Sequence, residues 1–216
     1  MPADYRAVEF PPVDLEIDRR PDGAMVMTPR EPLDVRDASV PAGLARQARL
    51  QPDKVHLAAR PGRGEPWVTA SFAEVKARAD ALTRFLLDRG VDPTRPLVIV
   101  SGNSIDHAVV RYGAMGAGVP VCPVSANYAL LGAAGGFERL RHVMDMVDPG
   151  FVFAETAAYA PAVDATAPAD AVVLSRAPEA FRVPAVDLAD VLSTRAGDDI
   201  EDRIAALDPD APAAYM

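Results

Sequence analysis

The stretch of sequence that decides the fold is residues 97–124, LVIVSGNSIDHAVVRYGAMGAGVPVCPV. It begins with four apolar residues, 97–100, which predict a strand covered on both faces of its sheet. Ser104 is placed to cap a helix formed by the residues that follow it. A second apolar run, 119–124, predicts another strand. Strand, helix and strand within about 30 residues have the size of a βαβ unit, whose two strands pair in parallel.

Capping residues mark two further helices nearer the N-terminus. Ser39 is a favourable N-cap for the first of them. Ser71 and Glu74 have the spacing of a capping box, which begins the second. Gly90 is predicted to end that helix, because glycine adopts the left-handed conformation at little cost. Between the two helices, alternating apolar residues predict a hairpin over 55–69.

The same alternation of elements continues towards the C-terminus. A loop over 125–136 is followed by a predicted helix that ends at 148–150. The later predictions are strands over 151–153, 171–174 and 183–186, and a short amphipathic helix over 200–207. We therefore predict an α/β fold with a doubly wound, mainly parallel sheet and flanking helices.

The chain is expected to divide into three parts. Residues 1–38 are predicted to be irregular, with only 24–27 forming a short strand. Residues 39–206 are expected to form the α/β unit. Residues 207–216 have the composition of an acidic linker that enters the first turn of a strand.

The composition excludes several classes of protein. A formal net charge of −9 over 216 residues argues against binding to nucleic acid or to anionic lipid. Cys122 is the single cysteine, so there is no intrachain disulfide, and no Cys/His spacing suits a metal site. The N-terminus does not resemble a secretory signal, and the apolar runs are too short to span a membrane. We expect a cytoplasmic protein with no metal ligand of its own.

Ligands of doubly wound sheets bind beyond the carboxyl ends of the strands, which here indicates residues 101–104 and 125–136. The turn over 101–104 could hold an anion on its backbone N–H groups, but a tight turn with an N-cap is the favoured interpretation. Arg139, Arg141 and His142 could attract an anionic ligand, although a solvated helix face is the favoured alternative.

Other candidate sites have simpler structural interpretations. The glycines at 113, 116 and 118 close a helix, whereas a dinucleotide-binding fingerprint would open one. Cys122 lies inside a predicted strand and is expected to be a buried structural thiol. The acidic run 198–202 suits the start of a helix better than a metal site. Three histidines form no metal spacing and no obvious base–nucleophile pair and are interpreted as surface or satisfied residues, His56, His107 and His142. No residue is predicted to be catalytic.

A series of motifs resembles a known family. Residues 50–55, LQPDKV, are similar to the entry segment of acyl-CoA synthetases, and residues 115–124, MGAGVPVCPV, to one of their strands. The chain is identified as the N-terminal portion of an adenylate-forming acyl-CoA synthetase, with likeness from about residue 24 to the end. Residues 101–108, SGNSIDHA, and 119–125, VPVCPVS, are most similar to feruloyl-CoA synthases.

This resemblance implies a two-step reaction. A carboxylic acid, here ferulate or a related hydroxycinnamate, reacts with ATP and Mg2+ to give an acyl-adenylate, and CoA then displaces AMP. The family's phosphate loop, its metal-binding glutamate and its mobile C-terminal domain would lie beyond residue 216. The resemblance therefore implies that these 216 residues alone are inactive and bind none of the cofactors tightly.

The resemblance also places two residues beside the approach of CoA, Asn127 and Tyr128. A basic residue of some relatives touches a CoA phosphate at the position of Asn127, which can donate a hydrogen bond but carries no charge. Two other hypotheses remain open. The chain is a noncatalytic binding or assembly module, which would form a homodimer through an exposed apolar face, or it is a gene remnant without function.

Overall fold

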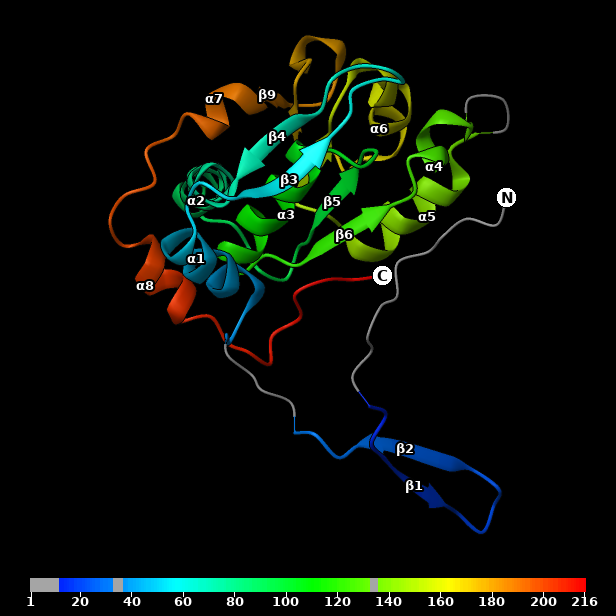
Figure 1. The fold of residues 1–216 in the computed structure, drawn as a ribbon. Helices are drawn as coiled ribbons and strands as arrows, with labels where there is room; N and C mark the ends of the chain where they lie inside the picture. Colours follow the sequence, from blue (N-terminus) through cyan, green and yellow to red (C-terminus); the bar gives the residue numbers. More distant parts are fainter. Residues whose placement is uncertain (1–11, 33–36, 133–135) are drawn as a thin grey trace, which may run out of the picture. The chain divides into compact units, whose positions relative to one another are not determined.

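The computed structural model describes residues 12–32, 37–132 and 136–216. The chain divides into two compact units, Met1–Arg36 and Asp37–Met216 (Figure 1). The sequence-based boundary between residues 38 and 39 lies close to the division between these units. The larger unit includes residues 207–216, which were expected to form a linker and the start of a strand.

The N-terminal unit contains a two-stranded antiparallel hairpin. Strands β1 (Leu15–Arg19) and β2 (Met25–Pro29) pair with Ile17 opposite Met27. Gly23 closes the turn with a φ of +87°. The expected short strand over 24–27 is present as β2, whereas β1 was not expected. Its signal is the alternation of apolar and acidic residues over 15–18, which is short but has the period of a strand.

The larger unit is built on a five-stranded sheet with the order β6-β5-β7-β8-β9, in which every neighbouring pair is parallel. The strands are β5 (Leu97–Val100), β6 (Val121–Val124), β7 (Phe151–Ala154), β8 (Val172–Ser175) and β9 (Ala185–Asp187). Strand β5 is fully buried along its length, as its unbroken apolar run predicts. The predicted doubly wound α/β fold with flanking helices is confirmed.

Helices cover both faces of this sheet (Figure 1). Leu97 and Ile99 of β5 belong to a core cluster with residues of α2 (Phe72–Asp88) and α3 (Ile105–Gly116). Val98 and Val100 belong to a second cluster with residues of α5 (Glu138–Val147) and α6 (Ala160–Thr166). Alternate residues of one strand thus enter opposite cores, because successive side chains of a strand point to opposite faces.

Residues before β5 add a helix and a hairpin outside the sheet. Helix α1 (Val40–Leu50) begins at Ser39, whose side chain accepts a hydrogen bond from the N–H of Ala42 at 3.2 Å. Strands β3 (Val55–Ala59) and β4 (Val68–Ser71) form the expected antiparallel hairpin. The capping box of Ser71 and Glu74 is present at the start of α2. These local signals are confirmed.

Two short helices occur where the sequence predicts none. The first, α4 (Asn127–Leu130), lies in the segment predicted to be a loop, and its Ala129 is buried in the second core cluster. The second, α7 (Leu188–Leu192), follows β9 directly and is capped by the side chain of Asp187. Both helices are too short to show a helical period in the sequence. They are stabilised by the tertiary packing of one or two apolar residues each.

The C-terminal residues return to the edge of the sheet. Helix α8 (Ile200–Ala205) lies against α1 and α2, and Glu201 forms an ion pair with Arg49. Beyond it, the N–H of Tyr215 donates to the carbonyl of Val121 at 2.9 Å, and Ala214 forms a parallel bridge with Val121. The start of a strand that the sequence suggests here therefore lies beside β6.

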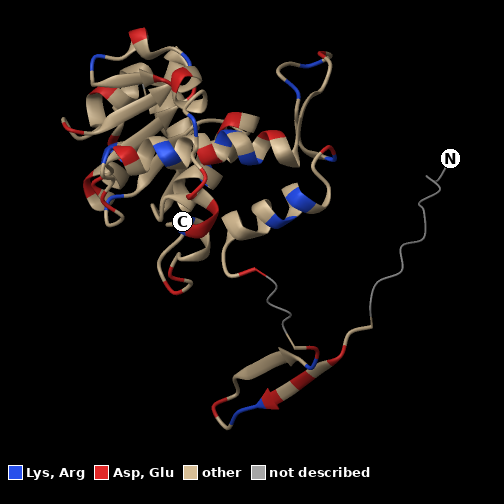
Figure 2. Cartoon of the chain, turned by 90° about the vertical axis from the view of Figure 1, so that its left-hand side faces the viewer, with Lys and Arg blue, Asp and Glu red and all other residues tan. Residues whose placement is uncertain are grey.

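The charge and hydropathy of the described helices bear on whether they cross a membrane or bind nucleic acid. None of them is long and apolar enough to cross a membrane. Figure 2 shows both basic and acidic residues on the side that faces the viewer, although α1 has arginines and no acidic residue. This distribution differs from the basic face that binding to nucleic acid requires.

Candidate functional site

The order of the strands reverses at β5, whose carboxyl end lies beside that of β7. The chain leaves β5 for β6 on one side of it and then crosses to β7 on the other side. This reversal is the topological switch point, where doubly wound sheets bind ligands. The residues that follow the two strands, Ser101 and Glu155, therefore lie at the candidate site.

Ser101 and His107 form a close pair at this point. The Oγ of Ser101 lies 2.8 Å from Nδ1 of His107, and both atoms contact the carbonyl of Gly102, at 3.0 and 3.2 Å. Burial lowers the pKa of His107, against the opposing effect of the Gly102 carbonyl. Ser101 is only 6% exposed. The pair therefore ties the turn to the first turn of α3 and presents no accessible nucleophile.

The turn over 101–104 is also a helix cap. The Oγ of Ser104 accepts a hydrogen bond from the N–H of His107 at 3.0 Å. This contact agrees with the interpretation of the segment as a tight turn with an N-cap. His107 is a satisfied histidine, as expected, since its ring and its backbone both have hydrogen-bond partners within the turn.

A charged group lies beside this turn. Two nitrogens of Arg176, at the end of β8, contact the carboxylate of Asp106 in α3 at 2.7 and 2.9 Å. Burial raises the pKa of Glu155, and the charge of Asp106 adds to this, whereas a hydrogen bond from Ser104 and the charge of Arg176 oppose it. Sequence reasoning missed this group because its members meet only through the order of the strands.

Asn127 and Tyr128 line a separate cavity of about 450 Å3. They lie on α4, just after the carboxyl end of β6, and Arg139 of α5 lines the same cavity. The guanidinium of Arg139 lies 5.8 Å from the centre of the Tyr128 ring. The cavity thus combines a side-chain amide, an aromatic ring and the guanidinium of Arg139, with the carboxylate of Glu138 also in its lining. This set suits an aromatic ligand that carries anionic groups, such as a nucleotide.

The remaining candidates have structural roles. Cys122 is buried, and burial raises the pKa of its thiol, as expected for an inert cysteine. A Cβ added at Gly113 would lie 2.7 Å from Cβ of Leu82, so close packing of α2 and α3 requires this glycine. The described residues contain no group of His, Cys, Asp and Glu side chains that could hold a metal ion.

Two further predictions are refined by the contacts of these residues. His56 is a satisfied histidine, as expected, because Nε2 lies 3.0 Å from the hydroxyl of Tyr112 and the ring stacks on Phe72 at 4.2 Å. The acidic run 198–202 is the start of α8, where Asp199 pairs with Arg84 of α2. These contacts connect elements that are far apart in the sequence and therefore left no local signal.

The fold and the polar carboxyl edge of its sheet define a doubly wound α/β unit of the kind that binds small ligands. Residues 44–216 match the family of AMP-binding enzymes, and the chain belongs to this family. A comparison with curated proteins finds no match.

Solved structures with the same fold include a fatty acyl-adenylate ligase from L. pneumophila in complex with acyl adenylate and pyrophosphate. It is 13% identical with a TM-score of 0.57, over 84% of this chain and 28% of that one. VinN is 23% identical with a TM-score of 0.59, over 84% and 40% of the two chains. IdnL7 is 18% identical with a TM-score of 0.60, over 83% of this chain and 33% of that one. The chain thus spans well under half of each protein.

Proposed function

We propose that this chain supplies the N-terminal α/β unit of an ATP-dependent acid–CoA ligase that works through an acyl-adenylate. The observation that carries the proposal is the match of residues 44–216 to the AMP-binding enzymes. The similarity of residues 101–108 and 119–125 to feruloyl-CoA synthases supports ferulate or a related hydroxycinnamate as the acid. ATP and Mg2+ would be held by parts of the ligase that this chain does not span.

The cavity beside α4 supports a role of this unit in the CoA step. The amide of Asn127 offers hydrogen bonds, the ring of Tyr128 offers a stacking surface, and Arg139 offers the charge that Asn127 lacks. CoA carries an adenine ring and several phosphate groups, and these three side chains fit that chemistry. We propose that Asn127 and Tyr128 line its approach.

The experiment compares two proteins. The first is the 216-residue chain, which is expected to give no ferulate-dependent exchange between ATP and pyrophosphate. The second is expressed from the source locus with any sequence that continues in frame, and it is expected to form AMP and feruloyl-CoA from ferulate, ATP, Mg2+ and CoA. Activity with hexadecanoate but not ferulate would overturn the proposed substrate, and inactivity with every acid would overturn the ligase proposal.

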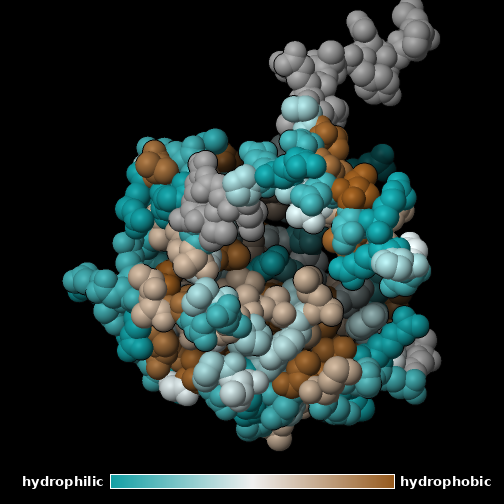
Figure 3. Space-filling model, turned by 90° about the horizontal axis from the view of Figure 1, so that it is seen from below, coloured by the Kyte–Doolittle hydropathy of each residue, from teal (hydrophilic) through white to brown (hydrophobic). Residues whose placement is uncertain are grey.

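One observation favours the assembly module as a second candidate. Met146, 66% exposed, and Tyr215, 40% exposed, line a groove of about 550 Å3 together with Met216. Figure 3 shows groups of hydrophobic residues among hydrophilic ones on the face seen from below. A noncatalytic module would cover this groove with a second copy of the chain. Sedimentation of the 216-residue protein tests this, because a monomer at all concentrations would contradict it.

A further inference from the structure

A further groove lies beside the turn over 101–104, which follows β5. It has a volume of about 290 Å3 and shares no lining residue with the cavity that contains Asn127 and Tyr128. Its walls come from strand β3, from the residue before β4 and from the start of α3. The lining residues are Leu57, Ala58, Ala59, Arg60, Trp67, Asn103, Ser104 and Ile105.

An exposed tryptophan forms one wall of this groove. Trp67 lies immediately before β4, and 59% of its surface is exposed. A side chain of this size gains much from burial, and exposed aromatic residues of this kind are frequent anchors in binding sites. Leu57 and Ile105, which also line the groove, are packed against the buried cluster around Val75, so they form a fixed apolar surface.

A guanidinium lies over the tryptophan. The Cζ atom of Arg60 is 4.6 Å from the centre of the Trp67 ring. Among the residues that the structure describes, no carboxylate lies within ion-pair distance of Arg60, whereas the nearby Arg176 is neutralised by Asp106. The charge of Arg60 is therefore available to an anion. Asn103 adds an exposed side-chain amide to the lining.

The groove lies at the end of the sheet where folds of this kind bind ligands. Asn103 and Ser104 belong to the turn at the carboxyl end of β5, beside the switch point of the sheet. The loop that joins β3 to β4 reaches the same end of the sheet as the arrowhead of β5 (Figure 1). Parallel sheets bind ligands at this end. The groove is thus a cavity with an aromatic wall, an unpaired cation and an amide, at a place where the fold favours a ligand.

We propose that this groove binds a small planar aromatic anion, whose ring stacks on Trp67 beside the guanidinium of Arg60 and whose anionic group pairs with that guanidinium. The volume of about 290 Å3 lies just below the range of about 300–1,000 Å3 for ligand pockets, so the ligand is a compact molecule. Asn103 donates a hydrogen bond to its polar edge. The site is additional to the proposed CoA approach and requires neither ATP nor Mg2+.

The chain provides its own reporter for a test. Trp67 is the single tryptophan of the sequence, so its emission reports on this groove alone. Benzoate is the probe, benzamide is its uncharged analogue, and excitation at the red edge of the tryptophan band limits absorption by the probe. We expect saturable quenching by benzoate, with affinity several-fold weaker for benzamide. No saturable change with benzoate would overturn the proposal.

Matched variants separate binding from a general effect of charge. Arg60→Gln is expected to weaken benzoate about fivefold, the size of a partly exposed ion pair. Arg63→Gln removes the same charge from the same loop, but Arg63 does not line the groove, so this variant should bind as the unmodified chain does. Equal affinities of the two variants would overturn the role of Arg60.

A measurement without tryptophan emission completes the test. In Trp67→Leu, saturation transfer from protein to benzoate in ligand-observed NMR is expected to disappear, while the far-ultraviolet circular dichroism stays unchanged. Saturation transfer that persists in this folded variant would overturn the stacking on Trp67. A negative result at this groove leaves the ligase proposal intact, because that proposal is measured by acid-dependent turnover of ATP.

Discussion

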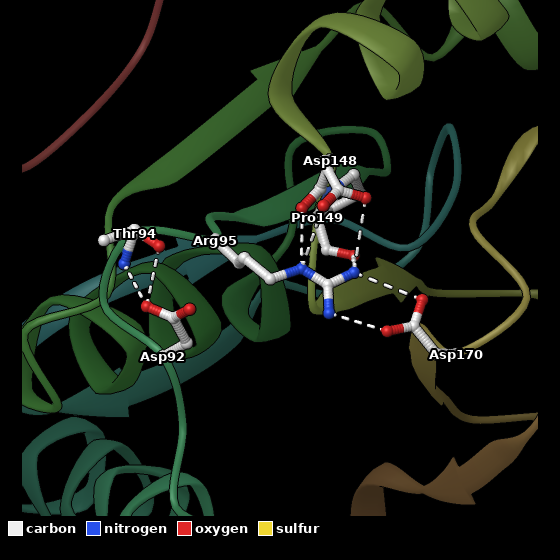
Figure 4. A network of polar contacts seen from close by, with 6 residues as sticks. All are labelled: Asp92, Thr94, Arg95, Asp148, Pro149 and Asp170. Atoms are coloured by element: carbon white, nitrogen blue, oxygen red, sulfur yellow. Dashed lines mark hydrogen bonds and ion pairs between the residues drawn. The ribbon is translucent and has the colours of Figure 1, made fainter.

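Arg95 and Asp170 form a two-contact ion pair that joins the loop before β5 to the loop before β8. The two guanidinium nitrogens lie 2.7 and 3.2 Å from the carboxylate oxygens (Figure 4). The same guanidinium donates to the backbone carbonyls of Asp148 and Pro149, at 3.1 and 3.3 Å, before β7. One side chain thus connects the amino ends of three neighbouring strands, at the edge of the sheet opposite the candidate site.

Arg95→Gln is therefore expected to lower the free energy of unfolding by about 1 kcal/mol. Glutamine keeps part of the length but loses the two-contact geometry and the bonds to the carbonyls. Urea unfolding followed by circular dichroism measures the change. Arg141→Gln, at an exposed position of α5, is the matched control and should leave the stability unchanged within about 0.5 kcal/mol. Equal stabilities of the two variants would show that the connection contributes nothing.

The stabilisation by this pair should depend on pH. The hydrogen bond from Arg95 and its charge hold the pKa of Asp170 below its ordinary value of 3.8. A carboxyl group with a lower pKa in the folded state stabilises the fold above its unfolded pKa, and this stabilisation is lost as the pH falls through the folded pKa. The gap in stability between the unmodified chain and Arg95→Gln is thus expected to be constant near neutrality and to shrink below about pH 4. A gap that widens on acidification would contradict this assignment.

Several parts of the fold could be predicted because their causes are local. The apolar run at 97–100 indicates a buried strand, and the pair Ser71 and Glu74 places the start of α2 at the observed residue. Each of these signals depends on neighbours within one turn or one strand. For the same reason, α4 could not be predicted, since its helical conformation depends on the packing of Ala126, Tyr128 and Ala129 against the second core.

The candidate site was less predictable than the fold. Asp106 and Arg176 are 70 residues apart and meet because β5 and β8 lie on either side of β7. The sequence does not show this order of strands. The pair of Ser101 and His107 is closer in the chain, but it depends on the conformation of the turn. A side-chain contact of this kind follows from backbone geometry that residue types alone do not determine.

The close packing of α2 on α3 predicts that a glycine-to-alanine substitution in α3 lowers the stability of the chain. Alanine in the interior of a helix normally stabilises it relative to glycine, by about 1 kcal/mol. At Gly113 the added Cβ would lie 2.7 Å from Cβ of Leu82 and 2.8 Å from the carbonyl of Ala79. Gly113→Ala is therefore expected to destabilise the chain by about 1–3 kcal/mol, because the two helices must separate. Thermal and urea unfolding measure this change.

Gly102 provides the control for this substitution. A Cβ at Gly102 meets no atom within 4 Å, and this glycine does not have a positive φ. Gly102→Ala should therefore change the stability by less than about 0.5 kcal/mol. A Gly113→Ala variant that is as stable as Gly102→Ala would mean that α2 and α3 tolerate a wider spacing than the structure shows.

The last prediction concerns the CoA step and rests on the proposed ligase. In the longer protein, Arg139→Gln is expected to raise the KM for CoA about fivefold, because the cavity loses its charge. Asn127→Ala should raise it about twofold, since the amide supplies only a neutral hydrogen bond. Neither variant should change the acid-dependent exchange between ATP and pyrophosphate, which precedes the entry of CoA. Leu130→Ala, on the same short helix but outside the cavity lining, is the control.

The effect of Arg139→Gln on the KM for CoA should weaken at high salt, because screening reduces the attraction between exposed charges. A loss of the exchange reaction together with the CoA effect would instead place these residues in the folding of the unit.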